Sequence, residues 1–198
     1  MKINKFVLLA ISISLVIASL AIFETSRPKE LNGAVINPPV AVSDFSLESA
    51  DGPVSLHDFR GKLVVLYFGY TSCPDVCPLT LSYLSKAVNS LGNQASDVQV
   101  IFVSVDWKRD TPEKLATYVN AFHPGFIGLT GNQSQIDQVT KEFGIYYQLN
   151  PPDANGFYSV DHTATVLVID RQGKWFLDWP YGTGPDKITS DLQTLVKE

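Results

Sequence analysis

The sequence predicts an α/β domain in which a mostly parallel central sheet is flanked by helices and ends in an antiparallel hairpin. Two observations predict this class. From residue 62 onward, short β-branched and aromatic runs alternate with longer segments whose apolar residues recur at helical spacing. Near the carboxyl end, segment 163–179 holds two apolar runs on either side of the turn at residues 171–173, which is typical of a hairpin.

The first half of this domain provides two strands, each followed by a helix. Residues 62–70 are β-branched and aromatic and predict a buried strand, whereas residues 78–91 carry apolar side chains at helical spacing. A second strand is predicted over 97–106 and ends in an acidic residue. The next helix begins at Thr111, because a proline and an early acidic residue follow this capping side chain, and it continues to residue 122.

The second half continues this alternation and then changes to strands. A helix is predicted over 132–144, with Asn132 as its cap and Gly144 at its end. The remaining predicted elements are a short buried strand at 125–131, two strands at 145–150 and 157–160 joined by a turn, and a final helix at 186–197. Strands and helices in alternation favour a mostly parallel sheet with helices on both faces.

The amino terminus resembles a membrane segment. Lys2 and Lys5 precede an uncharged stretch over residues 6–23, which is 18 residues long and close to the ~20 that cross a bilayer as a helix. We favour an uncleaved anchor over residues 1–26, because the apolar stretch exceeds the ~7–15 residues of a signal-peptide core. A signal peptide cleaved near residues 19–21 is the alternative. Both interpretations place the rest of the chain outside the cytoplasm.

Residues 27–43 are predicted to be a linker, because this segment contains three prolines and shows no sustained periodicity. The domain is then expected over 44–198. The first 30 residues hold four basic and two acidic side chains, so the remaining 168 carry 11 basic against 18 acidic side chains, a net charge of −7. An acidic domain of this kind is not expected to bind nucleic acid.

Both cysteines of the chain lie in the segment TSCPDVCP, residues 71–78. Cys73 falls in the loop after a predicted strand, and Cys77 falls in the first turn of the next helix. Both therefore lie at the carboxyl end of a strand, where open α/β sheets bind their ligands. Sulfurs four residues apart point the same way, and the helix amino terminus stabilises a thiolate. The pair therefore predicts either a redox disulfide or a soft-metal site. A purely structural disulfide is less expected, because so small a loop removes little chain entropy.

The three histidines stand in different surroundings. His57 lies in a polar turn, and His123 ends a predicted helix, where a cation complements the helix dipole. His162 has Asp161 beside it and immediately precedes the most apolar strand of the second half. His162 is therefore the best third ligand, although these surroundings alone do not decide between a ligand and a structural histidine.

The chain closely resembles the Sco/SenC family in four segments that occur in the family's order and spacing. This family comprises membrane-anchored, thioredoxin-like copper proteins that assist the assembly of cytochrome c oxidase. The four segments are YFGYTSCPDVCPLTL at 67–81, VSVDWKRDTPEKLATYV at 103–119, GLTG at 128–131 and VDHTATVLVID at 160–170. The resemblance runs from about residue 42 to the carboxyl terminus, and it implies a thioredoxin-like central mixed sheet flanked by helices.

The resemblance implies that Cys73, Cys77 and His162 bind one copper ion. Two thiolates and an imidazole suit Cu(I), and with a further oxygen donor they also suit Cu(II). Asp106 and Asp161 are expected near this site, where a carboxylate could orient the imidazole or guide a partner; for Asp106 a purely structural place before the helix is an equal alternative. The chain departs from the family's usual Asp-Pro-Glu-Arg-Asp in having DWKRD at 106–110.

The resemblance further implies a copper chaperone that delivers its ion to the dinuclear copper centre in the copper-bearing subunit of cytochrome c oxidase. Other copper chaperones or thiol reductants would be its further partners, and the empty cysteine pair could also reduce the acceptor's cysteines. The main alternative is a thiol-disulfide oxidoreductase or peroxidase of the thioredoxin superfamily, in which Cys73 and Cys77 are catalytic and His162 has no role. A redox-silent interaction domain is a third hypothesis.

Overall fold

The computed structural model describes residues 30–197. The predicted membrane anchor, residues 1–26, lies outside this range. Among the helices within it, none has both the length and the apolar character needed to cross a bilayer.

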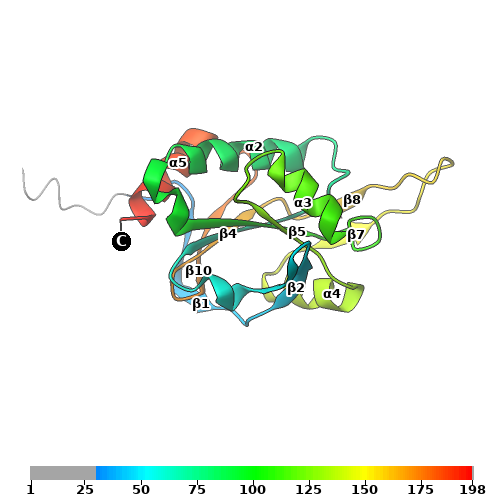
Figure 1. Ribbon diagram of the computed structural model, residues 1–198, viewed down its shortest axis with the longest axis horizontal. Coiled ribbons are helices and arrows are strands. Elements are labelled where there is room, and N and C mark those ends of the chain that lie inside the picture. The colour runs from blue at the N-terminus through cyan, green and yellow to red at the C-terminus, as the bar shows by residue number, and fades with distance from the viewer. Residues whose placement is uncertain (1–29, 198) are drawn as a thin grey trace, which may run out of the picture. The chain divides into compact units, whose positions relative to one another are not determined.

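Six strands form the central sheet, in the order β1-β10-β9-β4-β5-β6 (Figure 1). Their bounds are Ala34–Ala41 for β1, Leu63–Gly69 for β4, Val98–Ser104 for β5, Ile127–Leu129 for β6, Val166–Ile169 for β9 and Lys174–Trp179 for β10. Strands β4, β5 and β6 are mutually parallel, whereas β9 is antiparallel to both β4 and β10, and β1 is antiparallel to β10. The sheet is therefore mixed, as the family resemblance implied.

The expectation of a mostly parallel sheet is wrong for the half that contains β9, β10 and β1. After β6, the chain passes through helix α4 (Gln133–Glu142) and then through a separate two-stranded sheet made of β7 (Tyr147–Leu149) and β8 (Val160–His162). This excursion returns the chain to the sheet from the opposite end, so β9 enters antiparallel to β4. A buried apolar run has the same pattern in either direction, so the sequence pattern did not reveal this reversal.

Within residues 30–197, four helices cover the two faces of the sheet. Helices α2 (Val76–Asn89), α3 (Pro112–Asn120) and α5 (Pro185–Leu195) lie on one face, and α4 lies on the other (Figure 1). The two crossovers β4-α2-β5 and β5-α3-β6 run in the same direction along the sheet, and right-handed crossovers then place α2 and α3 on the same face. All four helices were predicted from the sequence, within a few residues of their observed ends.

Strands β4 and β5 are buried along their whole length and form the centre of the core. Adjacent side chains of β4 point to opposite faces, as expected for a strand. Tyr67 contacts the ring of Phe102 in β5 at 5.8 Å between centroids, and Phe102 in turn contacts Tyr118 of α3. Phe68 instead contacts Phe143, at the end of α4, at 6.0 Å. The residues of β4 thus reach both helical layers.

The structure corrects the predicted start of the domain. Residues 27–43 were expected to be a linker, but β1 lies within them and pairs with β10 along the edge of the sheet. This strand is mostly exposed and contains Pro38 and Pro39, which have no amide hydrogen to donate. Prolines are tolerated on an edge strand, and here they hide the strand from sequence patterns. The short hairpin of β2 (Ser46–Ser49) and β3 (Gly52–Ser55) was also not predicted.

A buried carboxylate in helix α5 (Pro185–Leu195) accepts hydrogen bonds from the residues just before β1. Asp191 of α5 is almost fully buried, and its two oxygens accept hydrogen bonds from three residues. The backbone and side-chain amides of Asn32 donate to Oδ1 at 2.8 and 2.7 Å, the Gly33 amide donates to Oδ2 at 3.0 Å, and the Trp179 indole donates to Oδ2 at 2.9 Å. Asp191 therefore attaches the start of β1, at the edge of the sheet, to helix α5.

We predict that Asp191→Ala lowers the free energy of unfolding by about 2 kcal/mol, because the buried Trp179 indole loses its acceptor and the turn at Asn32 loses its anchor. Urea unfolding of the purified chain, followed by circular dichroism, measures this change. The control Asp51→Ala, at the exposed β2–β3 turn, should stay within about 0.5 kcal/mol of the unmodified chain. Equal stability of the two variants would contradict the assignment.

Candidate metal centre

The two cysteines lie at the junction between β4 and α2, as predicted. Strand β4 ends at Gly69, and Cys73 follows in the connecting loop with its side chain half-buried. Cys77 is the second residue of α2 and is fully buried. Both cysteines are free thiols, and the Cys77 amide donates to Cys73 Sγ at 3.4 Å. The helix amino terminus thus points its amide at the more exposed sulfur.

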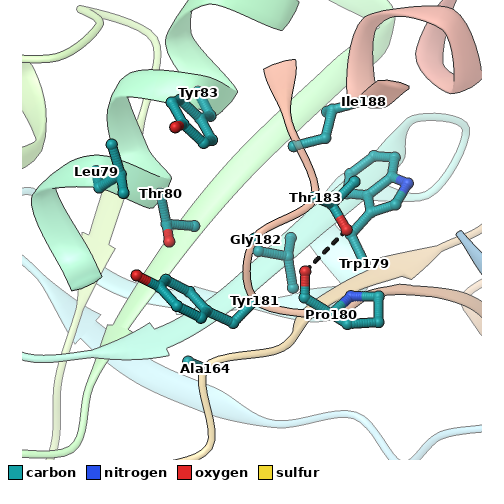
Figure 2. Close-up of a pocket in the computed structure, with 11 residues that line it drawn as sticks. Leu79, Thr80, Tyr83, Ala164, Trp179, Pro180, Tyr181, Gly182, Thr183 and Ile188 are labelled. Carbon is teal, nitrogen blue, oxygen red and sulfur yellow. Dashed lines mark hydrogen bonds between the residues drawn. The ribbon is translucent and has the colours of Figure 1, made fainter. Parts of the chain in front are cut away.

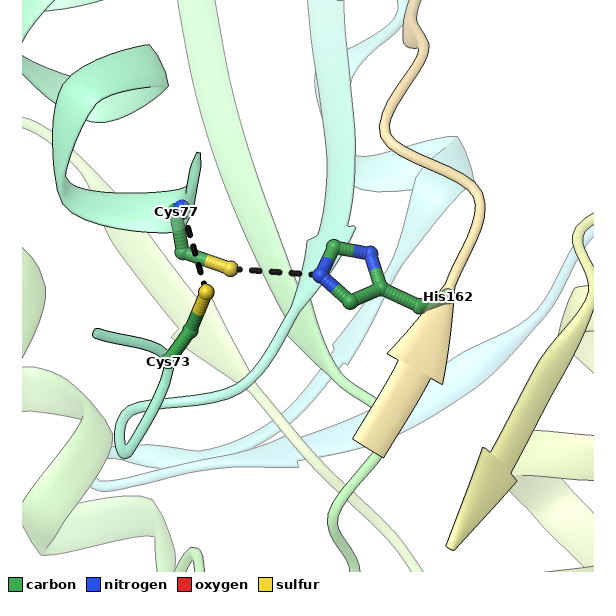
Figure 3. A group of neighbouring side chains, drawn as sticks. All are labelled: Cys73, Cys77 and His162. Carbon is green, nitrogen blue, oxygen red and sulfur yellow. Dashed lines mark hydrogen bonds between the residues drawn. The ribbon is translucent and has the colours of Figure 1, made fainter. Parts of the chain in front are cut away.

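His162, the last residue of β8, faces the same two sulfurs (Figure 3). Its Nε2 lies 3.4 Å from Cys77 Sγ, across 85 residues of sequence. Its Nδ1 lies 3.1 Å from the Thr163 carbonyl oxygen. Because a carbonyl oxygen only accepts, Nδ1 carries the proton in this contact, and Nε2 is the ring nitrogen that faces the sulfurs. A hydrogen bond of this kind fixes the tautomer of metal-binding histidines.

One sulfur from each cysteine and one ring nitrogen from His162 all lie within 4.8 Å of one another. In the part of the chain that the structure describes, this is the one group of three side chains with suitable ligand atoms at such distances. The other two histidines do not contribute to it. His57 is exposed, and His123 accepts a hydrogen bond from the Gly125 amide and contacts the Phe126 ring. The structure therefore brings together the two cysteines and the one histidine that the sequence singled out.

The two thiols differ in acidity because they share a hydrogen bond. The Cys77 thiol as donor lowers the pKa of Cys73, and the amides of Cys77 and Asp75 lower it further, although burial alone raises it. The same hydrogen bond, followed by burial, raises the pKa of Cys77. The protons of such a pair leave in two steps that belong to both groups. The shared hydrogen bond therefore makes Cys73, the more exposed sulfur, the more acidic of the two, because it lowers the pKa of Cys73 and raises the pKa of Cys77.

Gly69 makes room for the buried sulfur. A Cβ atom at this position would lie 2.7 Å from Cys77 Sγ and 2.7 Å from the Phe102 ring, closer than real contacts allow. Only glycine therefore lets the end of β4 pass this close to the thiol. The sequence analysis did not identify Gly69 as a site residue, because a glycine at the end of an apolar run is indistinguishable from an ordinary turn residue.

Two tyrosine rings surround the imidazole of His162. The Tyr70 ring contacts it edge-to-face at 5.8 Å between centroids, and the Tyr67 ring does so at 6.3 Å. The Tyr67 hydroxyl is buried and forms no hydrogen bond within the described part of the chain. Burial is the largest cause that raises the pKa of this hydroxyl. Tyr67 therefore stays protonated, and its hydroxyl is a donor beside the Cys77 sulfur. Sequence reasoning had treated both tyrosines as strand residues.

Asp110 holds the cysteine loop in place, and the sequence analysis missed it. Its buried carboxylate accepts hydrogen bonds from the amide and hydroxyl of Thr71, from the Ser104 hydroxyl at 2.6 Å and from the Lys114 ammonium at 2.8 Å. Burial raises the pKa of Asp110, but these hydrogen bonds outweigh burial and lower it overall. The carboxylate therefore remains charged and fixes Thr71, two residues before Cys73. In the sequence, Asp110 stands directly before the residues that start α3, and nothing local marks its contact with Thr71, 39 residues away.

The two other aspartates expected near the site are not part of the cluster. Asp106 is fully buried, but it pairs with Arg109 and accepts a hydrogen bond from the Tyr158 hydroxyl at 2.7 Å. Asp161 is exposed and lies opposite Gln148 in the register of β7 and β8. Because it directly precedes His162 in the strand, its side chain points to the opposite face. Neither carboxylate orients the imidazole, because its ring proton goes to a backbone carbonyl.

An apolar pocket lies between α2 and the loop that joins β10 to α5 (Figure 2). Leu79, Tyr83, Trp179, Tyr181 and Ile188 are among its lining residues, and the Thr183 hydroxyl donates to the Pro180 carbonyl at its rim. None of the residues that line it is a cysteine, histidine or carboxylate. The pocket therefore lacks groups for metal or redox chemistry, which we assign to the cysteine and histidine cluster.

Comparisons with known proteins agree with this geometry. The SCO1/SenC family model matches residues 34–197. A SCO2-like protein of Rickettsia felis is 38% identical over 152 residues, which are 76% of this chain and 74% of that protein.

Two solved structures are also similar. Apo Sco1 from Thermus thermophilus is 42% identical with a TM-score of 0.77, and the match covers 84% of this chain and 97% of that one. Bradyrhizobium japonicum ScoI with copper bound is 33% identical with a TM-score of 0.72, and the match covers 79% and 99%. The family match covers the chain from β1 to α5 and includes all three residues of the cluster. The chain therefore belongs to the SCO1/SenC family.

Proposed function

We propose that this protein is a copper carrier that binds one copper ion through Cys73, Cys77 and His162. The observation that carries the proposal is the convergence of two sulfurs and one imidazole nitrogen within 4.8 Å, from segments far apart in the chain. Thiolates are soft ligands that select Cu(I), and an imidazole nitrogen suits copper in both oxidation states. The structure of the related Bradyrhizobium japonicum ScoI with copper bound supports this choice of metal.

The unequal exposure of the two sulfurs suggests an order for copper transfer. Cys77 is fully buried, whereas Cys73 is half-buried and reachable from solvent. An acceptor thiolate would therefore displace Cys73 first, while Cys77 and His162 still hold the ion. Each further acceptor ligand then displaces one of these two. By the family resemblance, the acceptor is the dinuclear copper centre of cytochrome c oxidase, and other copper chaperones would supply the ion.

The same asymmetry supports a second activity, reduction of the acceptor's disulfide before delivery. The Cys73 thiolate attacks one sulfur of that disulfide, and the other sulfur leaves as a thiolate and takes up a proton. Cys77 loses its proton and attacks Cys73 Sγ, which breaks the mixed disulfide and releases the second acceptor thiolate. The acceptor gains two electrons, and Cys73 and Cys77 become a disulfide, which an external dithiol must reduce again. The lowered pKa of Cys73 favours it as the attacking sulfur.

We further propose that the domain works on the extracytoplasmic side of a membrane, to which residues 1–26 anchor it. The basic residues Lys2 and Lys5 before the apolar stretch favour retention of the amino terminus inside. A thiol-disulfide oxidoreductase without a metal is the competing proposal. It accounts for the acidic thiol at Cys73, but it leaves the approach of His162 to the sulfurs without a purpose.

We predict that His162→Ala weakens Cu(I) binding by at least about 10-fold, because the loss of a direct ligand should exceed the loss of an outer-shell partner. Competition with a chromophoric Cu(I) chelator measures the affinity of the reduced chain. The sulfur-to-copper charge-transfer band of the Cu(II) form should also change. His123→Ala is the matched control and should leave both unchanged. Indistinguishable affinities for His162→Ala and the control would contradict the three-ligand site.

We also predict that Cys73 in the metal-free chain is alkylated with an apparent pKa below the ~8.5 of a free cysteine. Cys77→Ala should raise this pKa, because the thiolate of Cys73 loses its main hydrogen-bond donor and its charged form becomes less favourable. The rate of iodoacetamide modification against pH measures both values. A pKa at or above 8.5 in the unmodified chain would count against both transfer and reduction through Cys73.

A further inference from the structure

A second cluster of charged and aromatic side chains lies next to the copper site and has no role in the mechanism above. Asp106, in the loop that follows β5, is fully buried. Its carboxylate accepts hydrogen bonds from Arg109 Nε and, at 2.7 Å, from the Tyr158 hydroxyl. Arg109 Nη1 donates to the Tyr158 carbonyl at 2.8 Å, and the guanidinium carbon lies 3.5 Å from the centroid of the Tyr158 ring. Arg109 thus holds both the ring and the backbone of Tyr158.

These contacts cross between two parts of the chain. Asp106 and Arg109 belong to the loop after β5, whereas Tyr158 lies in the excursion between β7 and β8. In Figure 1, this excursion projects from the body of the domain as a long yellow hairpin. Residues 151–157 are exposed, and β7 and β8 pair with each other rather than with the central sheet. An isolated two-stranded hairpin is only marginally stable in water, so its position depends on contacts with the body.

The hairpin carries His162, four residues after Tyr158. Burial and the Asp106 carboxylate raise the pKa of the Tyr158 hydroxyl to about 12. The hydroxyl therefore stays protonated and remains a hydrogen-bond donor to Asp106. A second line of contacts joins Arg109 to the imidazole through Tyr70. The guanidinium lies 5.9 Å from the centroid of the Tyr70 ring, and this ring lies 5.8 Å from the His162 ring. Arg109 therefore touches both the segment that leads to His162 and a ring that packs on it.

We propose that Asp106, Arg109 and Tyr158 form a latch that fixes the hairpin against the body and thereby positions His162 over the two cysteines. In this latch, Arg109 is a positioning residue that never contacts the metal. The inference rests on the proposed copper site and adds the element that determines how often its third ligand is in place. With the latch broken, the two cysteines stay on their loop and helix, but His162 moves with the hairpin.

Tyr158→Phe tests the latch most gently, because it removes one oxygen atom and keeps the stacked ring. Arg109→Lys keeps the positive charge and removes the fork that holds both Asp106 and the Tyr158 carbonyl. Each change is made in the full chain with His162 present and again with His162→Ala. Arg171→Lys is the matched control, because Arg171 also donates to two backbone carbonyls, those of Gly61 and Val196, at a site outside the cluster.

With His162 present, both latch variants should weaken Cu(I) affinity by about 10-fold, as expected for outer-shell partners of a metal ligand. In the His162→Ala background, the same changes should alter affinity by less than about twofold, since the latch acts only through His162. The control should have no effect in either background. An equal loss in both backgrounds would show general damage to the fold and overturn the proposal. No loss with His162 present would also overturn it.

A measurement without copper separates this proposal from the carrier function. Amide hydrogen exchange of the metal-free chain should become faster over residues 157–163 in Tyr158→Phe, and stay unchanged in α5. Unchanged exchange over 157–163 would overturn the latch, whatever the chain binds. Failure of the carrier function appears differently, as the absence of Cu(I) binding by the unmodified chain. If Arg109→Lys does not fold, Tyr158→Phe alone decides in both experiments.

Discussion

The approach of His162 Nε2 to Cys77 Sγ at 3.4 Å is the contact on which the chemistry of this domain depends. It joins two segments that are separated by 85 residues, and the fold contains specific arrangements that permit it. Gly69 leaves space for the sulfur at the end of β4, and Asp110 holds the loop that carries Cys73. On the other side, a short two-stranded sheet brings the imidazole over the carboxyl end of β4, where open α/β sheets bind their ligands.

Burial gives two chemically identical residues different roles. Cys77 is fully buried in the first turn of α2 and keeps its proton, whereas Cys73 is half-buried and receives hydrogen bonds that favour its thiolate. A carrier needs one ligand that holds the ion and one that an acceptor can reach. A thiol reductant needs one attacking and one resolving sulfur. The same asymmetry suits both of the activities that we propose, copper delivery and reduction of the acceptor, without further residues.

The sequence predicted those parts of the fold whose pattern is local. Strand β4 is a long apolar run, and α4 begins at the capping residue Asn132, so both were located within two residues of their observed ends. Edge strand β1 was missed because its prolines and exposed side chains resemble a linker, and only pairing with β10 defines it. The cysteines were singled out by their motif and His162 by the family resemblance, and the structure brings the three side chains together. Asp110, Gly69 and Arg109 were not singled out, because their roles depend on three-dimensional neighbours that no spacing reveals.

The central claim is that two sulfurs and one imidazole nitrogen bind the same copper ion. X-ray absorption spectroscopy of the Cu(I)-loaded chain tests this most directly, because scattering from sulfur and from nitrogen is distinguishable in the first coordination shell. The account predicts two sulfur neighbours and one nitrogen neighbour, with the outer-shell pattern of an imidazole ring. A shell made of sulfur alone, whether from one chain or from two, would contradict it and leave a dithiol protein in which His162 has no part.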